Sequence, residues 1–216
     1  MEKYIIFDID GTINKTENYV FKAYKECFEK YGINITKNEI IKFIGCTPKQ
    51  IQDMYFSNKN EEFLKKWYED IEKYEKEYMD KYAEPFYGVI DSLEKLKNEG
   101  YKLVVCSNAD DNHITNVLNA IKLTKYFDYK CSIINGYEKK DILKIFLDSK
   151  KPCNACMIGD RKFDKEAAKY NKIPFIGCNY GYAPNEIKDA DIVIQNASEI
   201  YDAVKSIIWK FIIEKR

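Results

Sequence analysis

Short runs of apolar residues alternate along the chain with longer segments in which apolar residues recur every three or four positions. The short runs predict β-strands at residues 4–7, 103–106, 130–133, 155–158 and 174–177, with a sixth at 191–194. The periodic segments predict helices at residues 89–98, 141–147, 164–170 and 198–213. Alternating strands and helices are typical of an α/β protein. We therefore expect a Rossmann-like parallel sheet of five to six strands with helices on both faces.

The first two predicted strands are separated by about 95 residues, far more than an ordinary crossover requires. Helical patterns fill this gap. Residues 17–31 are periodic and stop at Gly32, Thr36 and Glu39 form a capping-box pattern, and residues 61–82 carry an apolar stripe. We expect residues 15–83 to form an all-helical insertion in an α/β core made of residues 1–14 and 84–216.

Composition and charge narrow the classes of partner. The chain has 35 basic and 35 acidic side chains, and this balance argues against nucleic-acid binding through a general excess of positive charge. No apolar stretch reaches the roughly 18 residues of a membrane span, and the first strand follows Met1 without a secretory signal. We expect a cytoplasmic protein that binds neither nucleic acid nor membrane. The apolar residues 207–213 pack in the core or form a dimer contact, so the protein is a monomer or a homodimer.

The clearest chemical signal follows the first predicted strand, where Asp8 and Asp10 stand two residues apart and Gly11 comes next. Both carboxylates reach the edge at which the chain leaves the sheet. Gly11 lets the backbone turn so that its N–H groups face an anion. Two neighbouring carboxylates repel each other unless a cation or a shared proton holds them. Because hard cations take oxygen ligands, this pair suits a nucleophile and an acid at a Mg²⁺ site.

Further polar groups stand where later strands end. Ser107 and Asn108 follow strand 103–106 and offer a hydroxyl and an amide to a phosphate. Asp160 and Asp164 follow strand 155–158 and are four residues apart at a helix start, so they share one face. Open parallel sheets bind ligands at the carboxyl ends of their strands. We therefore expect these groups to converge on one site.

The motifs, taken in order, resemble those of the haloacid dehalogenase-like superfamily, and within it the phosphoglycolate phosphatase-like branch with an α-helical cap. The resemblance covers essentially the whole chain. It is carried by residues 8–12, the helical insertion, and residues 87–89, 107–108, 139, 159–164 and 176–181. It implies that the insertion is a cap over the α/β core and that the chemistry is metal-dependent phosphoryl transfer.

The resemblance also implies a role for each motif residue. Asp8 would be the nucleophile that forms an aspartyl-phosphate, and Asp10 would protonate the leaving alcohol and then deprotonate water. Mg²⁺ would be held by Asp8, the backbone carbonyl of Asp10, Asp160 and Asp164. The phosphoryl oxygens would be bound by Gly11, Thr12, Ser107, Asn108 and Lys139.

Two lysines compete for the phosphate-binding role, since Lys139 and Lys140 both precede the helix at 141–147. Lys139 stands three residues before Ile142, the first apolar helix position, as the family pattern prefers, and Lys140 is the alternative.

Asp10 separates branches of the superfamily. Relatives that dehalogenate lack an acid there and transport ATPases carry threonine, so an aspartate indicates phosphatase or phosphomutase chemistry.

We therefore expect a Mg²⁺-dependent phosphatase that acts on a small phosphorylated metabolite. Phosphoglycolate is the first candidate substrate, followed by nucleotides, sugar phosphates and pyrophosphate. The alternatives within the class are a phosphomutase or a pyrophosphatase of the same fold, and the alternative outside it is a non-catalytic partner-binding protein. Residues 44–49 either face the active site or form a turn between two helices of the insertion.

Overall fold

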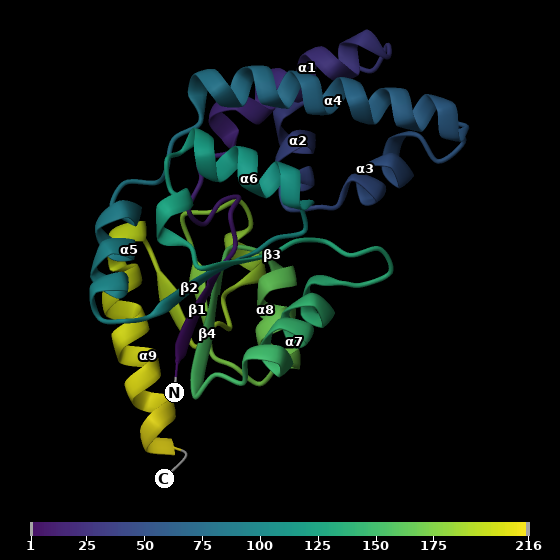
Figure 1. Ribbon diagram of the computed structural model, residues 1–216. Helices are drawn as coiled ribbons and strands as arrows, with labels where there is room; N and C mark the ends of the chain where they lie inside the picture. Colours follow the sequence, from purple (N-terminus) through teal and green to yellow (C-terminus); the bar gives the residue numbers. More distant parts are fainter. Residues whose placement is uncertain (1, 215–216) are drawn as a thin grey trace.

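A six-stranded parallel sheet forms the centre of the molecule (Figure 1). The computed structural model describes residues 2–214, with side chains described for all of these except Pro48 and residues 209–214. The strands are β1 (Lys3–Phe7), β2 (Lys102–Cys106), β3 (Tyr129–Cys131), β4 (Asn154–Gly159), β5 (Phe175–Cys178) and β6 (Ile192–Ile194). Their order is β3-β2-β1-β4-β5-β6, and every neighbouring pair is parallel. The predicted fold class is confirmed.

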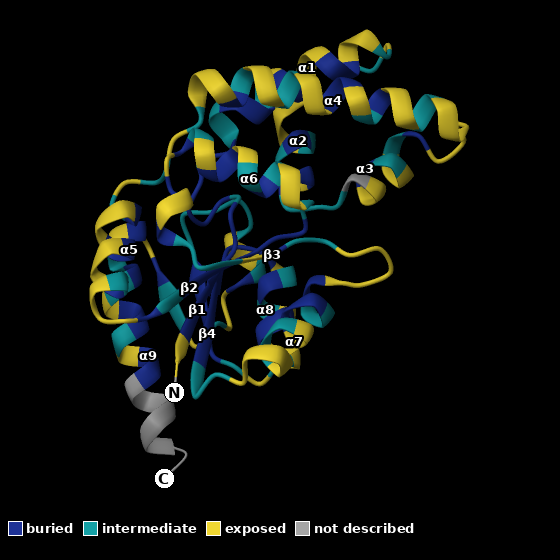
Figure 2. Cartoon of the chain, in the orientation of Figure 1, coloured by how far each residue is buried: buried dark blue, intermediate teal, exposed yellow. Residues whose placement is uncertain are grey.

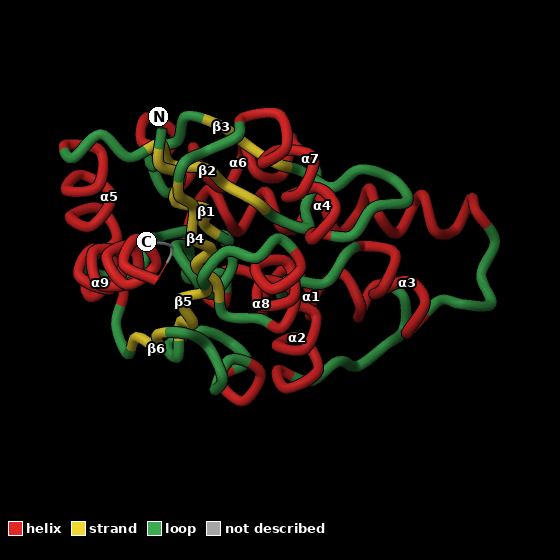
Figure 3. Tube along the Cα trace, turned by 90° about the horizontal axis from the view of Figure 1, so that it is seen from below, coloured by secondary structure: helices red, strands yellow, loops and turns green. Residues whose placement is uncertain are grey.

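Helices cover both faces of this sheet. The core helices are α5 (Val89–Asn98), α6 (Asp111–Ala120), α7 (Lys139–Lys150), α8 (Lys162–Tyr170) and α9 (Ile200–Glu214). In Figure 3, α5 and α9 lie on one side of the row of strands and α8 on the other. Ile5 and Phe7 pack into the cluster that contains α5 and α9, whereas Tyr4 and Ile6 pack with α7 and α8. Because β1 is buried on both faces from Tyr4 onward, its sequence is an unbroken apolar run from Tyr4 to Phe7.

Four further helices lie between β1 and α5 in the described chain. They are α1 (Glu17–Lys30), α2 (Lys37–Phe43), α3 (Pro48–Tyr55) and α4 (Glu61–Tyr82). Figure 1 shows them as a layer beyond the end of the sheet, and Figure 2 shows that the outward face of α4 is largely exposed. Phe28 is fully buried within this layer, and its ring contacts those of Phe43, Phe56 and Trp67. An aromatic cluster of this kind stabilises the layer through its own apolar packing.

Two helices lie where the sequence pattern predicted none. α3 begins at a capping box between Thr47 and Gln50. α6 begins after Asp110, whose Oδ1 accepts a hydrogen bond of 2.8 Å from the backbone N–H of His113. Both helices are short, and their capped N-termini mark where they begin. α6 also carries a buried apolar stripe of Ile114, Val117 and Leu118, which the sequence prediction missed.

Element boundaries also differ from the predicted ones. The third strand was predicted at residues 130–133 but ends at Cys131, because the backbone N–H of Ile133 bonds to the carbonyl of Ala109 and leaves the sheet. At the chain end, Ile207 and Ile208 are buried in the core, and residues 209–213 lie outside the described side chains. None of the helices within residues 2–214 is long and apolar enough to cross a lipid bilayer.

Candidate active site

Three buried carboxylates meet at the carboxyl end of the central strands. Asp8 directly follows β1, Asp160 directly follows β4, and Asp164 lies in the first turn of α8. One carboxylate oxygen from each of the three lies within 4.8 Å of the others. Asp8 is 4% exposed, and the other two are fully buried. Because β1 and β4 are neighbours at the point where the strand order reverses direction, the fold places these groups in the crevice that open α/β sheets use for ligands.

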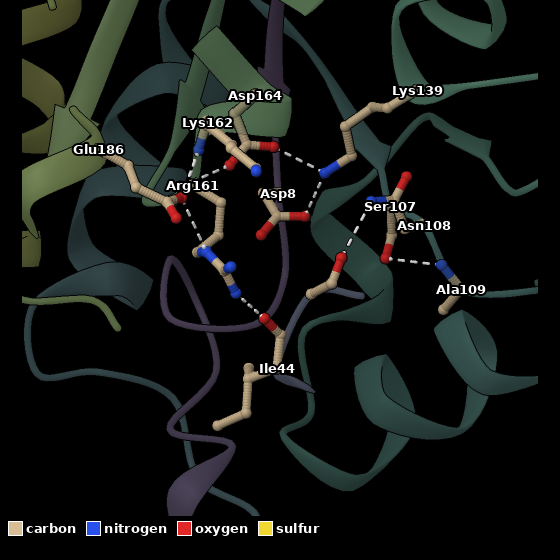
Figure 4. A network of polar contacts seen from close by, with 11 residues as sticks. Asp8, Ile44, Ser107, Asn108, Ala109, Lys139, Arg161, Lys162, Asp164 and Glu186 are labelled. Atoms are coloured by element: carbon tan, nitrogen blue, oxygen red, sulfur yellow. Dashed lines mark hydrogen bonds and ion pairs between the residues drawn. The ribbon is translucent and has the colours of Figure 1, made fainter. Parts of the chain in front are cut away.

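Lys139 lies between two of these carboxylates (Figure 4). Its Nζ is 2.6 Å from Asp8 Oδ1 and 2.7 Å from Asp164 Oδ1. Burial lowers the pKa of this ammonium, but Asp164 and Asp8 outweigh burial and hold the pKa above its ordinary value. The side chain is therefore a charged partner at neutral pH. Lys140, in contrast, is partly exposed and pairs with Glu138, so only the first of the two lysines reaches the carboxylates.

The position of Lys139 follows from the start of α7. Glu138 is the N-cap residue, and its backbone N–H donates to the Asp141 side chain at 3.1 Å. The helix therefore begins at Lys139, two residues earlier than the apolar pattern predicted. A residue in the first turn of α7 lies close to the carboxyl edge of the sheet, because α7 follows β3 in the chain.

One ammonium does not balance three buried carboxylates. Burial and then Asp164 raise the pKa of Asp8 to about 7, against the opposing effect of Lys139. Burial, Asp8 and Asp164 together raise the pKa of Asp160 well above its ordinary value. Asp160 Oδ2 accepts a hydrogen bond of 2.6 Å from the backbone N–H of Tyr182, but its Oδ1 is buried and has no partner among the described residues. An orphaned carboxylate oxygen in an all-oxygen donor set fits a hard divalent cation.

Glycines allow the backbone to approach these carboxylates closely. A Cβ on Gly159 would lie 2.3 Å from the Asp164 carboxylate, and one on Gly181 would lie 2.2 Å from Asp160 Cβ. Gly11 has a φ of +76°, and a Cβ there would lie 2.4 Å from Asp160 Oδ2. Any other residue at these positions would displace a carboxylate, so the glycines define the space in which the site is built.

Asp10 is held apart from the carboxylate cluster. Its Oδ1 accepts a hydrogen bond of 2.5 Å from the Thr16 hydroxyl and a longer one of 3.4 Å from Asn14 Nδ2. Asn14 Nδ2 also donates to Thr16 Oγ1 and to the Tyr19 hydroxyl oxygen, which ties the loop after β1 to the start of α1. Thr12, in the same loop, is fully buried, and its hydroxyl has no hydrogen-bond partner in the described part of the chain.

The two polar residues after β2 face different neighbours. Ser107 Oγ accepts a hydrogen bond of 3.2 Å from the backbone N–H of Ala109. Asn108 Nδ2 donates to the carbonyl oxygen of Gly45 at 2.9 Å, so its amide contacts the loop between α2 and α3 (Figure 4). The structure thus brings Ser107 and Asn108 to the same edge as Lys139, and Asn108 joins that edge to the helical layer.

Sequence reasoning assigned no role to three residues that shape the site. Arg161 donates from Nη1 to the carbonyl oxygen of Ile44 and from Nε to Glu186 at 3.1 Å. Tyr182 holds Asp160 through its backbone and bonds Glu17 through its hydroxyl. The third, Thr16, orients Asp10. Arg161 lies inside the 159–164 motif, but nothing in the spacing identifies its distant partners, and Thr16 carries no pattern of its own.

These features define an α/β enzyme with a buried carboxylate site at the carboxyl edge of its sheet. The model of the family described as haloacid dehalogenase-like hydrolase matches residues 5–178, and the chain belongs to that family. Two relatives are each 24% identical: the phosphoglycolate phosphatase of Aquifex aeolicus over 216 residues (96% of this chain, 99% of the relative), and pyrophosphatase PpaX of Bacillus cereus over 166 residues (74% and 75%).

Solved structures show the same fold. A structure titled as a predicted phosphatase from Clostridium acetobutylicum is 25% identical, with a TM-score of 0.78 and coverage of 95% of this chain and 99% of that one. The β-phosphoglucomutase of Clostridium difficile has a TM-score of 0.82 at 19% identity, covering 99% of this chain and 100% of that one. The likeness therefore extends through the core and the inserted helices.

The raised pKa of Asp8 predicts how the stability of the metal-free protein depends on pH. An acid whose pKa is higher in the folded state binds its proton more tightly there, so the free energy of unfolding falls as pH rises from about 4 to about 7. Asp8→Asn removes this loss. We subtract the free energy of unfolding of wild type from that of the variant, both measured with urea in the presence of a chelator. This difference should rise by up to about 4 kcal/mol between pH 4 and pH 8.

Asp53→Asn, at an exposed position on α3, is the control for the loss of a surface charge. A stability difference between Asp8→Asn and wild type that stays constant over this pH range would show that the Asp8 carboxyl is not destabilised by its neighbours.

Proposed function

We propose that the protein is a Mg²⁺-dependent phosphatase that hydrolyses a small phosphate monoester through an aspartyl-phosphate on Asp8. The observation that carries this proposal is the buried cluster of Asp8, Asp160 and Asp164 around Lys139. Family membership supports the reaction class, as do relatives named phosphoglycolate phosphatase and pyrophosphatase. The substrate is a small phosphorylated metabolite, with phosphoglycolate, nucleotides, sugar phosphates and pyrophosphate as the compounds to compare.

The chain's own residues perform the two displacements. Asp8 Oδ1 accepts a hydrogen bond from Lys139, so the other oxygen of that carboxylate attacks phosphorus. The bond between phosphorus and the ester oxygen breaks as the new bond forms. Asp10 gives its proton to the departing alcohol oxygen. Water then attacks the phosphorus of the aspartyl-phosphate while Asp10 takes a proton from it, and phosphate leaves with Asp8 regenerated. The hydrogen bond from Thr16 orients Asp10 for both transfers.

Asp8, the backbone carbonyl of Asp10, Asp160 and Asp164 would hold the metal ion. The orphaned Oδ1 of Asp160 and the excess of buried negative charge support this assignment. When bound, Mg²⁺ supplies positive charge that neutralises the phosphoryl oxygens and the attacking carboxylate. Lys139 adds a second positive charge at the same place. Gly11, Thr12, Ser107 and Asn108 would complete the phosphate site with backbone N–H, hydroxyl and amide groups.

We further propose that residues 15–83 act as a cap over a core formed by residues 1–14 and 84–216. Two contacts tie residues 44 and 45 of the insertion to the site: Arg161 donates to the Ile44 carbonyl, and Asn108 donates to the Gly45 carbonyl. Of the two readings of residues 44–49, these contacts support a loop that faces the site. A cap closed in this way excludes bulk water while the ester reacts.

A panel of phosphate monoesters assayed with Mg²⁺ and with a chelator tests the proposed function. We expect turnover with the metal and none in the chelator, because the carboxylate charge is then uncompensated. Asp8→Asn and Asp10→Asn should each abolish turnover, while circular dichroism shows that both remain folded. Hydrolysis by either variant at a substantial rate would refute the mechanism, and transfer of the phosphoryl group between positions of a sugar phosphate would favour a phosphomutase.

Lys139→Ala and Lys140→Ala form a matched pair that separates the two lysines. The first should lower kcat by about 10²–10³-fold, because it removes the ammonium that contacts Asp8 and Asp164. The second should change kcat by less than about twofold, since Lys140 is partly exposed and pairs only with Glu138 among the acids of the described chain. Steady-state kinetics with saturating metal measure both, and a larger effect of Lys140→Ala would reverse the assignment.

A further inference from the structure

A small cavity lies between the helical layer and the core, directly against Asp10. Its volume is about 80 Å³, and it is enclosed by side chains from α1, α2, α3, α4 and α6. Asp10 lines this cavity, whereas Asp8 and Lys139 do not. If Asp10 protonates the departing alcohol, as the proposed function requires, then this cavity is where the alcohol portion of the substrate lies.

The cavity is strongly acidic. Glu72, Glu75 and Asp110 line it together with Asp10, and among the described residues that line it there is no lysine or arginine. Its one basic side chain is His113, whose Nδ1 lies 3.7 Å from Glu75 Oε2. Asp110 already accepts hydrogen bonds from the His113 backbone N–H and the Tyr68 hydroxyl. An alcohol that carried a carboxylate or a second phosphate would therefore meet uncompensated negative charge in a poorly solvated space.

Glu75 is a largely buried carboxylate in the wall of this cavity. It lies on α4 with a side chain only 13% exposed, and no ammonium or guanidinium pairs with it in the described chain. Burial raises the pKa of this carboxyl and Asp10 and Glu72 add to the effect, whereas His113 and a hydrogen bond with the Tyr24 hydroxyl oppose it. A positively charged group in the cavity would offset the cost of burying the Glu75 charge more effectively than the partly exposed His113 does.

The remaining walls suit an ammonium group. The rings of Tyr19, Tyr24, Phe43 and Trp67 line the same cavity, and an aromatic enclosure with a carboxylate at one side binds cations through their attraction to ring faces. Trp67 is 1% exposed, and its Nε1–H has no acceptor among the described residues. A buried donor without an acceptor is rare in folded proteins.

We propose that Glu75 makes this cavity select the departing alcohol by charge, and that the preferred substrate is the phosphate monoester of a small amino alcohol. This inference rests on the proposed phosphatase function. The size of the cavity limits the alcohol to a few heavy atoms, since pockets for larger ligands are roughly 300–1,000 Å³. A larger cavity of about 780 Å³ shares Tyr68 and Asp110 with this one and is lined by Asn108 and Lys139 of the phosphate site. Asp10, which would protonate the departing alcohol, lines only the smaller of the two.

Three esters of nearly equal size test the charge selection: 2-aminoethyl phosphate, 2-hydroxyethyl phosphate and phosphoglycolate, which carry a cationic, a neutral and an anionic group. At pH 7 with Mg²⁺, kcat/KM should fall by at least about tenfold from the first ester to the second and again from the second to the third. Glu75→Gln should bring the ratio of the first two close to one. Glu69→Gln, the same change at an exposed position of α4, should leave that ratio as in wild type.

The possible outcomes separate this inference from the proposed function. If the neutral ester is hydrolysed but phosphoglycolate is the best substrate, or if Glu75→Gln leaves the ratio unchanged, the charge selection is refuted and the phosphatase assignment stands. If none of the esters is hydrolysed, the proposed function fails and this inference fails with it. The order of the three esters in wild type decides the question even if Glu75→Gln does not fold.

Discussion

Repulsion among three buried carboxylates is the constraint on which the rest of this structure depends. Asp8, Asp160 and Asp164 lie together with Lys139 as the cation that contacts two of them. Burial and the charge of Asp164 raise the pKa of Asp8 to about 7, and Asp160 Oδ1 has no hydrogen-bond partner among the described residues. Such an arrangement persists only where rigid surroundings prevent the groups from separating, and its oxygen donors are those that a hard divalent cation prefers.

The fold supplies that rigidity. β1 and β4 are adjacent central strands, each fully or largely buried, so the residues that follow them cannot move apart without disrupting the sheet. α7 and α8 pack on the same face and bring Lys139 and Asp164 to the edge. Three glycines, Gly11, Gly159 and Gly181, let neighbouring backbone approach the carboxylates without a steric clash. The helical layer contacts the site through the Ile44 and Gly45 carbonyls, and its Glu75 lines the same cavity as Asp10.

Much of the fold and of the candidate site could be predicted from the sequence, for identifiable physical reasons. Buried parallel strands appear as unbroken apolar runs, and the groups at their carboxyl ends meet at one edge of the sheet. The proximity of Asp8, Asp160 and Asp164 could therefore be predicted from the sequence. The strand order could not be read, because it depends on how crossovers pack rather than on any local pattern.

Contacts between segments far apart in the chain could not be predicted from the sequence either. The pairing of Arg161 with Ile44, and of Tyr182 with Asp160 and Glu17, depends on how the insertion lies over the core. The negative charge of the cavity around Asp10 could not be predicted for the same reason. Glu75 and Asp110 resemble solvated helix residues in the sequence, and only their convergence with four aromatic rings reveals a selective surface.

The central claim is that the phosphoryl group passes through Asp8 before it reaches water. Hydrolysis, in ordinary water, of a phosphorothioate monoester whose phosphorus carries sulfur, ¹⁷O and ¹⁸O in one configuration tests this most directly, because the thiophosphate that is released is chiral. Two successive in-line displacements, first by Asp8 and then by water, predict that the thiophosphate retains the configuration of the ester. Inversion would show a single direct attack by water and would contradict the account.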